Sequence, residues 1–188
     1  MKSGAQRVKL TYEDFLLFPD DGQRHELIDG EHYVTPSPNI THQGIVGNLY
    51  FRIRAWLEQH PIGKVFLSPL DVVFTRFDVV EPDLLYMSNE RAAAILTDEH
   101  VTGAPELVIE IASPITRKRD ETIKRQLYER SEVSEYWVVD PEIDVVRVYR
   151  YESGEFHRPI ELTAEADDGL TTQLLPGLKI SVKQIFVS

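Results

Sequence analysis

A run of apolar side chains at residues 107–112, Leu-Val-Ile-Glu-Ile-Ala, predicts a buried strand with one acid, Glu110, near its centre. The residues after it predict a helix, on which Asp120, Lys124 and Tyr128 recur every four positions and so share one face. An ionised carboxylate inside an apolar strand costs several kcal/mol unless it is paired, protonated or bound to a metal. This strand and this helix are therefore the first place to look for chemistry.

A longer helix is predicted at residues 39–59, where Asn39 can cap the first turn after a break at Pro36-Ser-Pro38. His42 precedes Val46 by one turn, so we expect its side chain on the packed side of this helix. The apolar positions recur at helical spacing and comprise Val46, Leu49, Tyr50, Ile53, Trp56 and Leu57.

Two local patterns define the N-terminal region. Thr11 and Asp14 have the spacing of a capping box, with Asp in place of the usual Glu or Gln, and predict a short helix that ends before Pro19. Asp29-Gly30 is a strong hairpin signal and predicts that the segments on either side of it pair as two strands.

The rest of the pattern predicts more strands and few helices. Residues 88–97 are helical or irregular, and residues 174–188 end in a short strand or helix. The predicted strands are residues 65–75, residues 79–87 with a break at Glu81-Pro82-Asp83, residues 134–139, and a hairpin of residues 145–151 and 155–162. We therefore expect an α+β or α/β chain with one mixed sheet and the long helix packed on it, in a single domain over residues 1–188.

Composition narrows the class of protein. Hydrophobic residues make up 42% of the chain and aromatic residues 10%, which is enough for a real core. There is no apolar run of about 18 residues, so no membrane span is expected. The N-terminal residues lack the apolar region of a signal peptide, and the absence of cysteine excludes disulfides and thiolate zinc sites. Together these features favour a soluble cytoplasmic protein.

The net charge of −11 argues against general electrostatic adhesion to nucleic acid, which requires a basic face. A local basic patch is still possible within an acidic chain. The densest cluster lies beside the central strand and contains Arg117, Lys118, Arg119, Lys124 and Arg125. The alternative is that this cluster is only the solvated start of a helix.

Asp83 and Glu110 occupy successive predicted strands that are otherwise apolar. Two acids on one face of a sheet repel each other unless a cation lies between them, and carboxylates are usual ligands of Mg²⁺. A lysine on the next helix, Lys124, could neutralise charge that develops on a phosphate. These are the parts of a metal-dependent phosphodiesterase. The alternative is a buried ion pair between Glu110 and Lys124 that fastens the helix to the strand.

These motifs together resemble the Uma family of restriction-endonuclease-like proteins, a bacterial branch of the PD-(D/E)XK nuclease superfamily. The resemblance covers nearly the whole chain. The segments that carry it are Pro82-Asp83, residues 105–114 (PELVIEIASP), Asp120, Lys124 and Tyr128, residues 135–141 (EYWVVDP), residues 26–31 (ELIDGE), His42, and residues 175–178 (LPGL).

The resemblance implies a restriction-endonuclease-like fold, a mixed β-sheet flanked by helices, with Asp83 and Glu110 as the metal-binding acids. It also reveals a departure from the superfamily pattern, which requires a lysine two residues after the second acid. That position is Ala112 in this chain. The resemblance therefore points to Lys124, on the following helix, as the source of the lysine.

Two further positions follow from the resemblance. The early acid of the family fits Glu26 or Glu31, and we favour Glu26 because Glu31, beside a hairpin tip, is more exposed to solvent. His42 matches a histidine of the family and would assist the site, although a hydrogen-bonded core histidine is the alternative.

The sequence thus predicts a Mg²⁺- or Mn²⁺-dependent endonuclease that hydrolyses DNA phosphodiester bonds and forms a symmetric homodimer. One alternative is a non-catalytic module that keeps the nuclease fold and has a regulatory role or binds nucleic acid or protein. The acidic net charge and the alanine at position 112 favour that alternative. The other alternative is the purely structural ion pair between Glu110 and Lys124.

Overall fold

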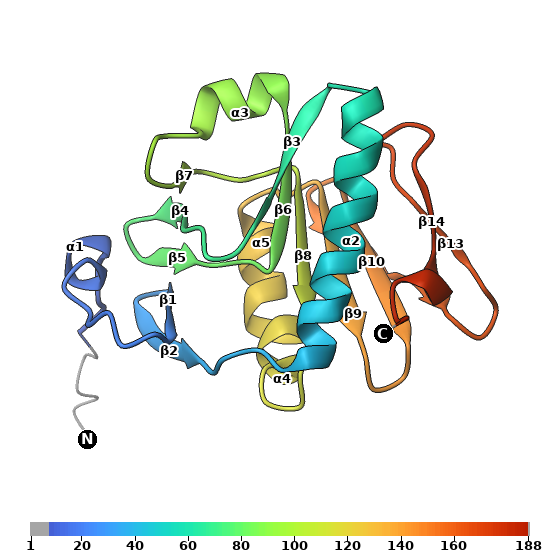
Figure 1. The fold of residues 1–188 in the computed structure, drawn as a ribbon. Coiled ribbons are helices and arrows are strands. Elements are labelled where there is room, and N and C mark those ends of the chain that lie inside the picture. The colour runs from blue at the N-terminus through green and yellow to red at the C-terminus, as the bar shows by residue number, and fades with distance from the viewer. Residues whose placement is uncertain (1–7, 188) are drawn as a thin grey trace.

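A sheet of seven strands runs through the centre of the molecule, and helices cover both of its faces (Figure 1). The computed structural model describes residues 8–187. The strand order is β11-β10-β9-β8-β6-β3, with β12 paired to β10. The strands of this central sheet are β3 (Gly63–Leu67), β6 (Leu84–Ser88), β8 (Leu107–Ile111), β9 (Glu135–Asp140), β10 (Val145–Glu152), β11 (Glu155–Phe156) and β12 (Ile160–Thr163).

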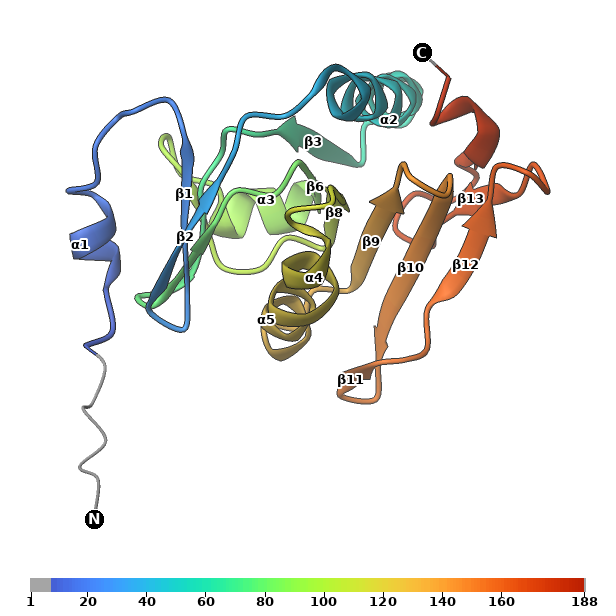
Figure 2. The same ribbon diagram turned by 90° about the horizontal axis from the view of Figure 1, so that it is seen from below.

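A second sheet of five strands, in the order β2-β1-β5-β4-β7, lies beside the central sheet (Figure 2). A two-stranded sheet of β13 (Gly169–Thr171) and β14 (Lys179–Ser181) precedes the C-terminal turn η2 (Val182–Gln184). The strands of the second sheet are β1 (Arg24–Ile28), β2 (Glu31–Thr35), β4 (Val72–Thr75), β5 (Asp78–Val80) and β7 (Val101–Thr102).

The central sheet is buried on both faces. One face packs against helix α2 (Ile40–Gln59) and the C-terminal segment, and the opposite face packs against α5 (Arg125–Arg130), α3 (Asn89–Ile95) and the second sheet. Every residue of β8 and β9 is buried, as expected for strands that are paired in parallel and covered on both sides. The mixed α/β architecture of the prediction is confirmed.

Several local predictions are confirmed. The Asn39 side chain accepts a hydrogen bond from the backbone N–H of His42 at 2.8 Å and begins α2, which ends at Gln59. Thr11 and Asp14 form the capping box of α1 (Tyr12–Phe15). The β1–β2 hairpin turns at Asp29 and Gly30, both with positive φ, in the turn geometry that this sequence favours.

The expectation of one mixed sheet is wrong, because two predicted strands each divide between two sheets. The predicted strand at 65–75 becomes β3 and β4, which are separated by residues 68–71. The predicted strand at 79–87 becomes β5 and β6 on either side of the break at residues 81–83. Each segment therefore crosses from one sheet to the other, and Asp83 lies at one of these crossings.

The helix predicted after β8 is also irregular. It consists of α4 (Arg117–Arg119), a π-helical turn η1 (Asp120–Lys124) and α5. The π-turn is closed by the N–H of Arg125, which donates to the carbonyl of Asp120. π-turns of this kind are frequent at functional sites. Within residues 8–187, no helix is long and apolar enough to cross a bilayer. That the chain forms a single domain stays a prediction.

Candidate active site

Asp83 and Glu110 lie opposite each other where β6 and β8 pair. Leu84 is paired with Ile109 at the end of this antiparallel ladder, and Asp83 and Glu110 are the residues directly beyond that last pair. Directly opposed residues project from the same face of a sheet. Both acids are buried, with exposed fractions of 2% and 3%, and both line a cavity of about 500 Å³. The fold therefore brings the two predicted metal ligands together.

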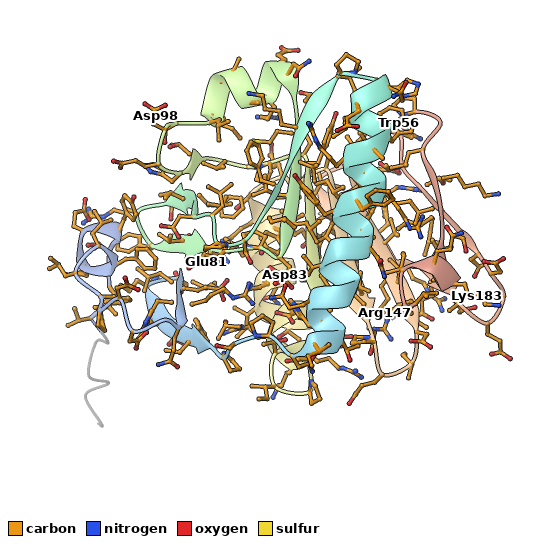
Figure 3. The ribbon with its side chains drawn as sticks, viewed as in Figure 1. Trp56, Glu81, Asp83, Asp98, Arg147 and Lys183 are labelled. Carbon is orange, nitrogen blue, oxygen red and sulfur yellow. The ribbon has the colours of Figure 1, made fainter. Side chains whose placement is uncertain are left out.

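The carboxylate of Asp83 is held by three donors. Its Oδ1 accepts from Arg24 Nη1 at 2.8 Å, and its Oδ2 accepts from the backbone N–H of Ile111 at 2.8 Å and from His42 Nε2 at 3.0 Å. Burial would raise the pKa of Asp83, but the hydrogen bond from His42 and the charges of His42 and Arg24 lower it to about 2. Asp83 is therefore ionised at neutral pH. Figure 3 shows it between the second sheet and the N-terminal half of α2.

Glu110 has the opposite electrostatic character. Its Oε1 accepts from Lys124 Nζ at 2.8 Å and from the hydroxyl of Tyr128 at 2.6 Å, while its Oε2 accepts no hydrogen bond from any residue within 8–187. Burial, together with the charge of Asp83, outweighs the nearby ammonium and raises the pKa of Glu110 to about 8. Burial therefore favours the protonated form of this acid, whereas a cation beside it favours the carboxylate.

Lys124 links two buried acids. Its Nζ lies 2.7 Å from Glu26 Oε1 and 2.8 Å from Glu110 Oε1. Burial would lower the pKa of Lys124, but the carboxylates of Glu110 and Glu26 raise it, so the ammonium stays charged. The ion pair of Glu110 with Lys124 that the sequence analysis considered is present. Lys124 and Ala112 both line the cavity that also contains Asp83 and Glu110.

Glu26 lies behind Lys124 and does not line the cavity. It accepts from the N–H of Glu81 at 3.1 Å and lies 3.5 Å from Arg119 Nη2. Burial would raise the pKa of Glu26, but the charges of Lys124 and Arg119 lower it. Glu31, the other candidate for the early acid, is exposed on β2 and lies outside the cavity.

His42 lies at the cavity and not only among core side chains. Its ring is largely buried and donates to Asp83, while its Nδ1 is buried and has no partner within residues 8–187. The side chain of His42 was predicted to lie on the packed side of α2, and this describes only part of its surroundings. The donor geometry assigns His42 to the support of Asp83.

Three cavity residues were not assigned to the site from the sequence. Arg24 lies two residues before Glu26 on β1, and this spacing places both side chains on one face, a signal that was available. Arg119 donates to Thr35 at 2.6 Å and pairs with Glu26. Asp120, 2% exposed, lines the cavity from the π-turn, and burial raises its pKa. No local pattern predicts the π-turn.

The basic cluster does not form a free patch. Arg117 pairs with Asp140 and Glu142, Arg125 pairs with Glu129, and Arg119 and Lys124 pair with Glu26. Lys118 is exposed. The alternative of a merely solvated helix start does not describe the cluster either, because four of its five cations are ion-paired and Lys124 is buried.

The donor set fits a divalent cation that binds oxygen. Within residues 8–187, no group of three or more His, Asp or Glu side chains is placed to hold a metal. Mg²⁺ is usually bound by one or two carboxylates, with water and substrate phosphates completing its coordination. Asp83 and Glu110 supply two carboxylates, and Glu110 Oε2 is free of hydrogen bonds. A cation there would favour the carboxylate form of Glu110, as the ammonium of Lys124 does.

The chain is similar to a known protein family in sequence and to a solved structure in fold. Residues 12–183 match a family model described as "Uma2: Putative restriction endonuclease". The fold is similar to a crystal structure described as "a putative nuclease belonging to DUF820 from Anabaena variabilis", with a TM-score of 0.79 and 22% identity, over 94% of this chain and 97% of that chain. At this identity the similarity establishes a shared fold. A search of curated proteins found no match.

Proposed function

The chain belongs to the Uma2 family, and from this membership and the geometry of the cavity we propose that it is a nuclease that hydrolyses DNA phosphodiester bonds with a divalent metal. One observation carries the proposal. Asp83 and Glu110 face each other in a cavity, and one oxygen of Glu110 is left without a hydrogen bond. The family description supports the reaction class, and the two carboxylates support the metal.

In this proposal Asp83 and Glu110 hold Mg²⁺ or Mn²⁺. When bound, such an ion polarises a phosphoryl oxygen and lowers the pKa of water. Lys124 faces the same space and would stabilise negative charge that develops on the phosphate. This role agrees with the resemblance, in which Lys124 takes the place of the lysine that position 112 lacks.

The remaining residues would act by positioning. Glu26 holds the ammonium of Lys124 at the edge of the cavity, and Tyr128 fixes the Oε1 side of Glu110 so that Oε2 is free. Arg24 and His42 orient Asp83 and keep it ionised. Removing one of these supports would weaken metal binding or misplace the lysine without removing a ligand.

One observation favours a second candidate, the non-catalytic binding module. The ammonium of Lys124 is engaged by two buried carboxylates, so its charge is already neutralised within the protein. A lysine held in this way binds a ligand phosphate less strongly than a free one. A cleavage assay separates this candidate from the nuclease.

Incubation of the purified protein with supercoiled plasmid in Mg²⁺, Mn²⁺ or EDTA tests the proposal. We expect metal-dependent nicking or linearisation by the wild type and a loss of about 100-fold or more in Glu110→Gln, which removes a ligand charge. Glu155→Gln, an exposed acid on β11, is the matched control and should cut like the wild type. Cleavage that Glu110→Gln leaves intact would refute the assignment of this cavity.

The homodimer stays a prediction. Its support is two exposed apolar side chains on α2, Ile40 at 92% and Phe51 at 67% exposure. Multi-angle light scattering at micromolar concentration measures the mass directly. A single species with the mass of one chain would contradict the dimer and would leave one cavity per particle.

A further inference from the structure

We propose that the cavity binds an unpaired nucleotide, so that the preferred DNA is single-stranded or locally unpaired at the phosphate that is cut. This inference rests on the proposed function, because it concerns the substrate of the same carboxylate site. It goes beyond that function by naming the strand state of the substrate and the residues that select it.

The walls of the cavity come from three connecting segments. These are the β2–α2 linker, the loop between β8 and α4, and the start of the β9–β10 turn. Figure 1 places the start of α2, α4 and the β9–β10 connection at the lower end of the molecule. The apolar residues that these segments contribute to the lining include Pro36, Pro38, Pro114, Ile115 and Pro141.

These walls suit the face of a base. Each proline fixes its own φ, so the rim is stiff, and Ile115 is 75% exposed at the opening. Proteins that take a nucleotide out of its stack hold the base between aromatic or apolar side chains. A charged or hydrated ligand alone would gain nothing from such a rim, whereas a base attached to the phosphate would bury its apolar faces there.

The size of the cavity also favours a single nucleotide as its ligand. A volume of about 500 Å³ lies in the range of sites for small molecules, roughly 300–1,000 Å³. Asp83 and Glu110 line this partly open cavity, and both side chains are buried. A base that packs against the rim must leave its partner and its stacked neighbours, so this mode of binding requires an unpaired nucleotide.

The charges around the cavity agree with this reading. Each arginine or lysine that lines it is already ion-paired: Arg24 with Asp83, Arg119 with Glu26, and Lys124 with Glu26 and Glu110. Binding of a duplex through its backbone depends on several cations that contact successive phosphates. This cavity has no such row among the described residues, so enclosure of a base is the larger source of affinity.

Binding is measured first without metal. Fluorescence anisotropy in EDTA compares a labelled single-stranded oligonucleotide, the duplex of the same sequence, and that duplex with an unpaired bulge. We expect the single strand and the bulged duplex to bind about tenfold tighter than the perfect duplex, because the latter must first unpair. Equal or tighter binding of the perfect duplex, or binding of none of the three, would overturn the inference.

A rim variant assigns the effect to the cavity. Ile115→Ala should weaken binding of the single strand by about fivefold, the lower end of what removal of a base-stacking side chain costs, and should leave the duplex unchanged. Leu17→Ala is the control, since Leu17 is 82% exposed and lies outside the cavity lining. Equal losses for both DNA forms in Ile115→Ala would overturn the role of the rim.

Cleavage with Mn²⁺ separates this inference from the proposed function. Faster cutting of the perfect duplex than of the single strand would overturn the inference and leave the nuclease intact. Selective binding of the single strand with no cutting of any substrate would support the inference and count against catalysis.

Discussion

Replacing Lys124 with methionine tests how much the fold depends on one buried ammonium. The change keeps most of the side-chain volume and removes the charge that lies 2.7 Å from Glu26 and 2.8 Å from Glu110. The three residues are 1–3% exposed, so water cannot replace the lost partner. Removing one member of a buried ion pair costs about 3–5 kcal/mol. A typical domain is stable by about 5–15 kcal/mol, so the loss is a large fraction of the total.

Urea unfolding followed by circular dichroism at pH 7 measures this loss. We expect the unfolding midpoint of Lys124→Met to fall in proportion to the missing free energy, with the slope unchanged. Lys118→Met is the matched control, because Lys118 is exposed on the neighbouring helical turn and should change stability by no more than about 0.5 kcal/mol.

The pH dependence of Lys124→Met gives a second check. In this variant the native state would hold protons on Glu26 and Glu110 more tightly than the unfolded state does. Stability therefore rises as pH falls, and the difference from the wild type narrows between about pH 8 and 5. The triple variant Glu26→Gln/Glu110→Gln/Lys124→Met removes both acids together with the ammonium, leaves only Arg119 without its carboxylate partner, and should recover much of the loss. An unchanged midpoint in Lys124→Met would refute the reasoning.

Three further predictions concern the metal and the scaffold. Because the pKa of Glu110 is raised to about 8 and a bound metal requires the carboxylate, calorimetric affinity for Mg²⁺ should rise between about pH 6 and 8 and then level off; a flat profile would contradict this. Asn39→Ala removes the cap of α2 and should cost about 1 kcal/mol in urea unfolding, and no change would argue against the cap. Gly30→Ala places a Cβ 2.6 Å from the Cβ of Lys9 at a positive φ and should lower the melting temperature, corresponding to roughly 1 kcal/mol or more; a normal melt would show that the turn can adapt.

The sequence predicted those elements that depend on local chemistry. The cap at Asn39, the capping box at Thr11 and the turn at Asp29-Gly30 each act over a few residues, and each forms as expected. An acid inside an apolar strand is also a local signal, which is why Glu110 was identified as a site residue before its neighbours were known.

The features that the sequence did not predict depend on contacts between residues that are far apart in the chain. The second sheet exists because β1 pairs with β5, two strands that are about fifty positions apart in the chain. This pairing also brings Arg24 to Asp83. The π-turn shifts the register of a helix that the four-residue spacing describes as regular. Asp120 was noticed on the face shared with Lys124, but its entry into the cavity depends on that turn.

The ammonium that bridges Glu26 and Glu110 has a consequence for the order of folding and metal binding. In many small metalloproteins the ligands repel one another until the ion arrives, so that metal supply and folding are a single event. In this chain Lys124 is the counter-ion of Glu26 and Glu110, and it reaches them when its helical segment packs on the central sheet. Folding of this site therefore does not wait for a metal, and under the proposed function metal binding would be a separate, later event.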